Sequence, residues 1–424
     1  MKDTDLIMKN ETSRCQDVNL AVITVCLGLI VGCSSMLLGV LLDTVEHLFL
    51  GFVENNKMPV AVNALPSRRL VSLIIGGIIS ATIWYFLQRN WEPVGINDSI
   101  KGKRMPIFRT AIHVITQIFY VSTGGSIGRE LAPRQAGAMI ADNLSRFFNR
   151  HGWSIAPEDR RLLIAAGAGA GFAGVYISPI TGTMFCLELL YKKINARSVA
   201  VSVTMSSIAT MVGAITKGFV PYYLTGNRHY GLVVIPLAIF LGIVNGFLGT
   251  VFKRFIKLAG QYRAKRKAIL WQFSLVGLLT GLVAMFFPAV CGNGRGLAQL
   301  AMNTTSSTDL NGALLWLVFG FFAKAIVTLL TIKGGGYGGT LTPSIAIGAC
   351  TGVLLGVVYM TIVPGLTLAQ CAVLGAVSLL AASQQAPLMA LFMIFEVCHM
   401  QYSALLPLGL AVAVSIWVSK QMQK

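Results

Sequence analysis

The chain alternates long apolar runs with short polar segments, and this pattern dominates its whole length. Several runs are long enough to cross a bilayer as single helices, and the apolar runs lie at residues 20–42, 70–87, 232–251, 269–290, 314–332, 341–363 and 405–418. Two shorter runs, 165–175 and 179–190, are rich in glycine or interrupted by proline, and would cross only partly or at a tilt. Because non-helical breaks at membrane depth need protein or a water-filled cavity around them, the pattern predicts an all-helical integral membrane protein with tilted and partial helices.

Composition supports this class. Of the 424 residues, 55% are hydrophobic and only 12% are charged, about half the charged fraction of a soluble domain. The first 18 residues are polar and lack the pattern of a cleaved signal peptide. We therefore expect a polar cytoplasmic N-terminus (1–18), a first membrane repeat (19–220), a second membrane repeat (221–419) and a polar tail (420–424).

Two glycine-rich breaks are near copies of each other. Residues 124–133 read GGSIGRELAP and residues 334–343 read GGGYGGTLTP, at a constant spacing of 210 residues. Each break runs into an apolar, helix-forming segment, so each is expected to present free backbone N–H groups at the N-terminus of a helix. Such a terminus is suited to binding an anion.

A second pair of segments repeats at nearly the same distance. Residues 167–188 match residues 375–396 at a spacing of 208, which aligns Pro179 with Pro387 and Glu188 with Glu396. A hydrophobic chain with interrupted helices at matching places in both halves is typical of a transporter whose binding site lies at the repeat interface.

The net charge of +18 comes from basic residues in the loops between apolar runs. One acid-free cluster consists of Lys253, Arg254, Lys257, Arg263, Lys265, Arg266 and Lys267. This distribution follows the positive-inside rule and argues against a nucleic-acid partner. It predicts a multi-pass protein of the cytoplasmic (inner) membrane of the cell, in contact with lipid. The positive charge of the protein also creates an electrostatic field that favours anions.

Glu130 is the principal candidate functional residue. An ionisable side chain at a membrane-embedded helix start is energetically costly and indicates function. Its carboxylate can compete with a free anion for the same N–H groups, staying when ionised and leaving when protonated. The alternative is a structural carboxylate that caps its own helix or pairs with Arg129.

Other chemistries find little support. His113 and His399 lie near membrane segments without any HExxH or clustered metal-ligand spacing, and no nucleotide-binding loop is present. We expect no catalytic residue, metal or cofactor, and hence no enzyme. An intramembrane enzyme is disfavoured because the sequence has no nucleophile and base at a recognisable spacing. A structural scaffold would leave the duplicated breaks unexplained. A cation carrier would need more acidic groups within the membrane segments.

These motifs resemble the CLC family of chloride channels and proton-coupled chloride transporters. Gly128-Arg129-Glu130 is similar to the family's gating-glutamate motif, residues 338–343 are similar to its second anion-binding helix start, and residues 291–294 and 380–396 follow in the family's order. The resemblance implies a homodimer with one pore per subunit, an inverted repeat and an external gate at Glu130. It also implies an outer anion site at Gly128, Arg129 and Leu131, and a central site at Gly339, Thr340 and Leu341.

The chain departs from the family pattern at several positions. The loop whose serine hydroxyl contacts the central ion in the family reads here Pro93-Val94-Gly95-Ile96-Asn97, so Val94, Gly95 and Ile96 would line the site without a hydroxyl. The proline of the gate motif arrives one residue late, at Pro133, and no tyrosine matches the family's C-terminal anion contact.

The internal proton glutamate of family antiporters is replaced by Leu189. Glu188 and Glu396 remain as structural carboxylates or as alternative proton relays. The sequence therefore predicts transport of a small anion, most simply chloride, with fluoride transport as the alternative within the family. Channel-like transport and proton-coupled exchange both stay open.

Overall fold

The computed structural model describes residues 2–226, 229–305 and 310–423, and these fold into helices. No strand occurs among them apart from an isolated antiparallel bridge between Gly128 and Gly339. Eight of the helices in this part of the chain are long and apolar enough to cross a membrane: Gln16–Leu50, Pro66–Asn90, Ala196–Lys217, Leu232–Gln261, Lys267–Phe286, Leu310–Lys333, Leu341–Met360 and Tyr402–Gln421. The predicted fold class, an all-helical membrane protein with partial helices, is confirmed.

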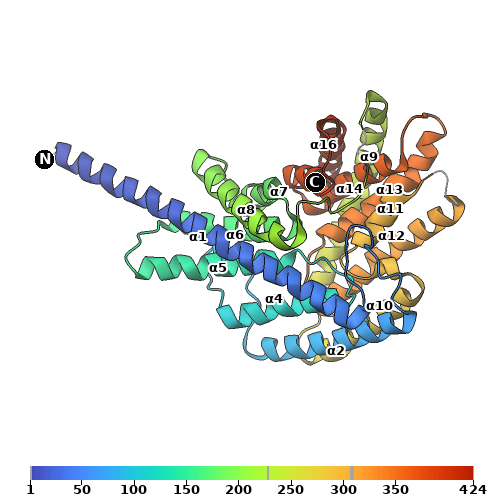
Figure 1. Cartoon of the computed structure of the whole chain (residues 1–424), viewed down its shortest axis with the longest axis horizontal. Coiled ribbons are helices and arrows are strands. Elements are labelled where there is room, and N and C mark those ends of the chain that lie inside the picture. Colours follow the sequence, from blue (N-terminus) through green and yellow to red (C-terminus); the bar gives the residue numbers. More distant parts are fainter. Residues whose placement is uncertain (1, 227–228, 306–309, 424) are drawn as a thin grey trace. The chain divides into compact units, whose positions relative to one another are not determined.

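Figure 1 shows the helices in chain order, coloured from blue to red. The α-helices are α1 (Lys2–Leu50), α2 (Pro66–Asn90), α3 (Ile96–Ile100), α4 (Ile107–Ser122), α5 (Leu131–Arg150), α6 (Pro157–Tyr176), α7 (Pro179–Met184), α8 (Ala196–Lys217), α9 (Ile235–Gln261), α10 (Lys267–Phe286), α11 (Arg295–Asn303), α12 (Leu310–Lys333), α13 (Leu341–Met360), α14 (Leu368–Gln384), α15 (Pro387–Val397) and α16 (Leu405–Gln421). A π-helical turn, η1 (Phe185–Tyr191), follows α7, and short 3₁₀ turns are η2 (Leu232–Val234), η3 (Pro288–Val290) and η4 (Tyr402–Ala404).

The chain forms two compact units that interleave along the sequence. The first comprises residues up to Leu38, Pro93–Val114 and Pro133–Phe219, and the second comprises Gly39–Glu92, Ile115–Ala132 and the rest from Val220. The two membrane repeats expected at residues 19–220 and 221–419 stay a prediction.

In the first unit, α6 and α8 pack through glycine. A Cβ atom added to Gly174 would lie 3.0 Å from the carbonyl oxygen of Ala209, and one on Gly213 would collide with the backbone of Gly174. Ser35 on α1 donates a 3.0 Å hydrogen bond to the carbonyl of Gly171. Small residues at these positions allow the close backbone approach that is common between membrane helices.

In the second unit, α2 and α10 run antiparallel with Gly77 facing Gly277, where an added Cβ on Gly77 would lie 3.3 Å from the partner Cα. Arg69, in the first turn of α2, donates to the carbonyl of Met285 near the end of α10, at 3.2 Å. At the opposite end, the N–H of Arg266 donates to the side chain of Gln88 at 3.2 Å. These contacts fix both ends of the pair.

The second duplicated segment has the same local geometry in both copies. α6 ends at Ile177, which adopts the left-handed conformation with φ 53° and donates to the carbonyl of Ala173. α14 ends at Gln385, with φ 56°, which donates to the carbonyl of Ala381. In each copy the next helix begins two residues later, at Pro179 or Pro387, because proline is well suited to the first position of a helix.

Candidate functional site

The two glycine-rich breaks meet in the second unit. The N–H of Gly128 donates to the carbonyl of Gly339 at 2.8 Å, and the N–H of Gly339 donates back to the carbonyl of Gly128 at 2.7 Å. α5 begins just after the first break, at Leu131, and α13 begins just after the second, at Leu341, with Thr340 as its N-cap. The predicted helix starts after both copies of the motif are confirmed.

Glu130 lies in this junction and is fully buried. Its Oε1 atom accepts a hydrogen bond of 2.6 Å from the backbone N–H of Leu341, the first residue of α13. A Cβ atom added to Gly128 or to Gly339 would collide with the Glu130 carboxyl group. Glycine at these two positions therefore makes room for the carboxylate.

The carboxylate thus caps the second helix start, 211 residues further along the chain. The first N–H groups of a helix lack partners within it, and the helix dipole adds partial positive charge at this end. A carboxylate is a favourable occupant of such a position, and a free anion is another. Glu130 holds a place that would suit an anion.

The start of α13 is fixed by hydroxyl and amide groups. Ser344 donates from its hydroxyl to the carbonyl of Thr340 at 2.7 Å, and Ser383 donates to the Ser344 hydroxyl at 2.8 Å. The side chain of Gln384 donates to the Thr340 hydroxyl at 3.3 Å. These contacts tie α13 to α14, so the N–H groups of the helix start are held in place.

Lys324 of α12 supports the first break from within the protein. It is fully buried, and its Nζ atom donates to the hydroxyl of Ser126 at 2.9 Å and to the carbonyls of Val290 and Gly292 at 3.2 and 2.7 Å. An ammonium group in such a place needs partners of this kind. Lys324 therefore joins the gate loop, which we define as residues 124–130, to the chain that precedes α11.

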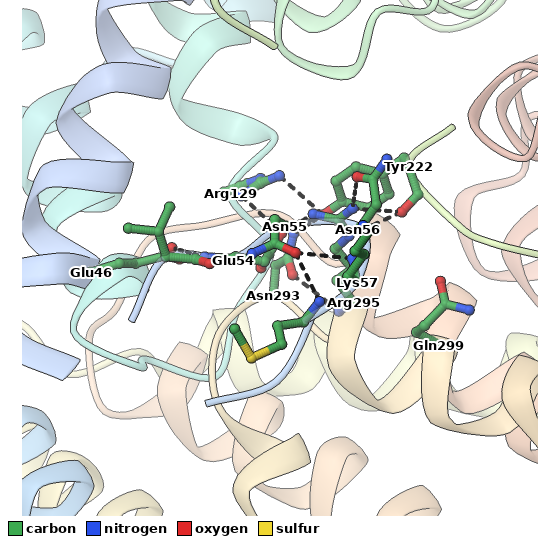
Figure 2. A network of polar contacts seen from close by, with 12 residues as sticks. Glu46, Glu54, Asn55, Asn56, Lys57, Arg129, Tyr222, Asn293, Arg295 and Gln299 are labelled. Carbon is green, nitrogen blue, oxygen red and sulfur yellow. Dashed lines mark hydrogen bonds and ion pairs between the residues drawn. The ribbon is translucent and has the colours of Figure 1, made fainter. Parts of the chain in front are cut away.

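Arg129 points into a polar cluster shown in Figure 2. Its guanidinium lies 3.4 Å from the Oε1 atom of Glu54 and donates to the hydroxyl of Tyr222 at 3.1 Å. The same Oε1 atom accepts a 2.9 Å hydrogen bond from Arg295, at the start of α11. One carboxylate oxygen therefore serves two guanidinium groups. We refer to this set as the Glu54 cluster; its members are Glu46, Glu54, Asn56, Arg129, Tyr222, Asn293 and Arg295.

The remaining members of the cluster restrain its charged groups. The Tyr222 hydroxyl accepts from Asn293 at 2.9 Å, and the Tyr222 carbonyl accepts from Arg295 at 2.8 Å. Arg295 also stacks on the Tyr222 ring, 4.0 Å from its centroid. The backbone N–H of Glu54 donates to Glu46 at 2.9 Å. The result is a buried ionic cluster beside the gate loop.

The other predicted site residues lie in the first unit, except for Glu396, which lies in the second. Val94 is buried just before α3, Gly95 is the N-cap of α3, and Ile96 is its first residue. Leu189 and Glu188 both lie in η1. Glu396 lies in the last turn of α15. Among the residues that the structure describes, no group of histidine, cysteine and carboxylate side chains is arranged to hold a metal ion.

Comparison with known proteins identifies the family. The sequence model of the voltage gated chloride channel family matches residues 76–420. The chain belongs to the voltage-gated chloride channel family. It is a multi-pass membrane protein that transports anions, and the predictions of family, of anion transport and of a non-enzymatic function are confirmed.

Curated members of this family are similar over most of the chain. The voltage-gated ClC-type chloride channel ClcB of Salmonella dublin is 27% identical over 398 residues, covering 90% of this chain and 91% of that protein. The protein of the same name from Citrobacter koseri is 28% identical over 394 residues, covering 89% and 90%.

Two solved structures have a similar fold over almost the whole chain. A slow cyanobacterial Cl⁻/H⁺ antiporter aligns with a TM-score of 0.81 at 22% identity, over 95% of both chains. A CLC-type fluoride/proton antiporter aligns with a TM-score of 0.72, also at 22% identity and over 95% of both chains.

Sequence reasoning missed four residues of the junction: Glu54, Tyr222, Arg295 and Lys324. Lys324 carries a signal, since it is an ionisable residue inside an apolar run, and such residues indicate function. Glu54, Tyr222 and Arg295 belong to non-repeated segments, and nothing in the local sequence indicates that they meet.

Proposed function

We propose that the protein transports chloride and that Glu130 is its gate. The observation that carries this proposal is the hydrogen bond from Leu341 N–H to the buried Glu130 carboxylate. When ionised, the carboxylate occupies the helix start and excludes a free anion. When a proton converts it to the neutral acid, it becomes a much weaker acceptor, and an anion can replace it at the N–H groups of Thr340 and Leu341.

Backbone donors suit a mobile ion. They provide partial charges and directed hydrogen bonds without the full positive charge that would trap a halide, and conduction requires binding weak enough for release. The outer site would use the N–H groups that follow Gly128, at Arg129 and Leu131. The central site would lie at Thr340 and Leu341, next to Gly339.

The charge distribution supports an external position for the gate. Arg263, Lys265, Arg266 and Lys267 precede or begin α10, so the positive-inside rule places the start of α10 on the cytoplasmic side. α10 is long enough to cross the membrane. The far end of α10, and the segment that leads from it to Arg295, would then lie near the outer side of the membrane. This segment contacts the gate loop through the hydrogen bond from Gly292 N–H to the carbonyl of Gly124, so Glu130 could exchange protons with the external solution.

The relatives favour chloride over the fluoride alternative, because the curated relatives quoted above are named chloride channels. Besides chloride, we propose that the protein binds protons, which it takes up at Glu130. We also propose a homodimer in the cytoplasmic membrane, with one pathway per subunit, as the family resemblance implies.

The test replaces Glu130 with glutamine in purified protein reconstituted into liposomes. Wild-type chloride flux should rise as the pH falls, whereas E130Q should be independent of pH because its amide mimics the protonated acid. E130D, which keeps a titratable carboxyl group, should retain pH dependence. A wild-type pH profile in E130Q would exclude Glu130 as the gate.

A further inference from the structure

The Glu54 cluster contains two buried guanidinium groups held by one carboxylate oxygen. The side chains of Arg129, Arg295 and Glu54 are 9%, 5% and 9% exposed, respectively, and so are largely removed from water. Buried charges are stable only when paired, and removing one partner leaves the other uncompensated. Without the Glu54 charge, the two guanidiniums would attract another anion.

This cluster is connected to the gate. Arg129 directly precedes Glu130 in the gate loop. A cavity of about 20 Å³, enough for one water molecule, is lined by Glu46, Glu54, Gly124 and Gly292 among others. The N–H of Gly292 donates to the carbonyl of Gly124 at 2.9 Å. A change at Glu54 is therefore positioned to act on the gate loop.

We propose that Glu54 occupies a second, latent anion site, formed by the guanidiniums of Arg129 and Arg295 and the hydroxyl of Tyr222. Its natural ligand class is a small monovalent anion, and Glu54 is the tethered competitor for it. Glu54 is thus a positioning residue: by holding Arg129 and neutralising its charge, it limits the capture of anions on their way to the gate. This inference rests on the proposed role of Glu130.

The charged groups around Glu54 determine the direction of the effect. Arg129 and Arg295 carry positive charge beside Glu54. Lys324 donates to the nearby Gly292 carbonyl, and Glu46 accepts a hydrogen bond from the backbone N–H of Glu54. Replacing the Glu54 carboxylate with an amide raises the net positive charge of this region. Anions should then accumulate, and the ionised form of Glu130 should be favoured.

The test measures chloride flux in liposomes against chloride concentration and pH for E54Q. We expect the half-saturating chloride concentration to fall by about fivefold or more, which is the lower end of coupling between sites. The midpoint of the pH profile should move to lower pH by a corresponding ~0.7 unit. E54D, which keeps the charge, should restore values near those of the wild type.

A matched control removes the same charge elsewhere. E158Q neutralises a carboxylate in a partly exposed ion pair with Lys193, and it should leave both measurements unchanged. Equal shifts in E54Q and E158Q would overturn the proposal, as would an unchanged half-saturating concentration in folded E54Q. If E54Q does not fold, E54N, which removes the same charge with a shorter side chain, serves instead and should shift both measurements in the same direction.

A double variant distinguishes this inference from the gate proposal. If Glu130 is the gate, the chloride flux of E54Q/E130Q should not depend on pH. Its half-saturating chloride concentration should still be lower than that of E130Q. If E130Q keeps the wild-type pH profile, the gate proposal fails, and the chloride dependence of E54Q still decides whether Glu54 competes with anions. An equal half-saturating concentration in E54Q/E130Q and E130Q would overturn the role of Glu54.

Discussion

The backbone N–H of Leu341 donates a 2.6 Å hydrogen bond to the carboxylate of Glu130. These residues come from the two copies of the glycine-rich motif, and the bond joins the copies through the position that an anion would take. The flanking backbone bonds between Gly128 and Gly339 make this contact possible. The proposed gate therefore depends on both copies of the motif.

The first prediction concerns Gly339→Ala. The new methyl group would collide with the Glu130 carboxyl group, whose side chain can move away. Loss of one hydrogen bond to a charged acceptor is worth about 1.5–3 kcal/mol, so the carboxylate should leave the α13 start more readily. The midpoint of the flux–pH profile should rise by about one to two units. Gly409→Ala is the control, since no atom lies within 4 Å of its added Cβ, and equal profiles for the two variants would contradict the prediction.

The second prediction concerns Lys324→Met, which removes three hydrogen bonds from buried acceptors. Leaving such groups without a donor should destabilise the protein by about 2–4 kcal/mol. Thermal unfolding in detergent would measure the loss. Lys333→Met, at the exposed end of the same helix, should change the stability by less than about 0.5 kcal/mol. Similar unfolding temperatures for both variants would show that Lys324 does not support the gate loop.

The helix starts and helix breaks could be predicted from the sequence, because they depend on the hydrophobic pattern and on the two duplicated segments. The starts of α5 and α13 and the breaks after Ile177 and Gln385 follow from glycine, proline and apolar runs in repeated positions. α8 was not among the predicted apolar runs, because serine and threonine interrupt its hydrophobic pattern. Polar residues of this kind can face neighbouring helices within a membrane protein, and local hydropathy does not show this.

The Glu54 cluster could not be predicted in this way. Glu54, Arg129, Tyr222 and Arg295 come from four separate segments, and their hydrogen bonds depend on how the chain folds. The family resemblance did imply that Arg129 belongs to the outer anion site. The structure adds Glu54, whose carboxylate offsets the charge of Arg129.

The third prediction concerns Leu189, which stands in η1 where antiporters of the family are expected to have a proton glutamate. We expect the wild type to couple protons to chloride poorly or not at all, because leucine cannot carry a proton. Leu189→Glu should raise the number of protons moved per chloride, whereas Leu189→Gln, similar in size and not titratable, should not. Simultaneous recordings of chloride and proton flux would give the ratio. A tight, constant ratio in the wild type would refute the prediction and direct attention to Glu188 or a water chain.

The final prediction concerns Val94→Ser. Val94 is buried immediately before α3, and its side chain offers an anion only apolar contact. A serine hydroxyl at this position could donate a hydrogen bond, which should alter the relative permeability of chloride, nitrate and fluoride because these anions differ in hydration and hydrogen bonding. The pH response should persist, since Glu130 is unchanged.

Val94→Thr adds a hydroxyl at nearly constant volume and should alter selectivity in the same direction, whereas Val94→Ala, which loses volume without gaining a donor, should not. Permeability ratios measured from reversal potentials in planar bilayers, or from relative fluxes in liposomes, would decide the matter. Unchanged ratios in both hydroxyl variants would mean that Val94 does not line the anion pathway, and that residues 93–97 do not correspond to the serine loop of the family.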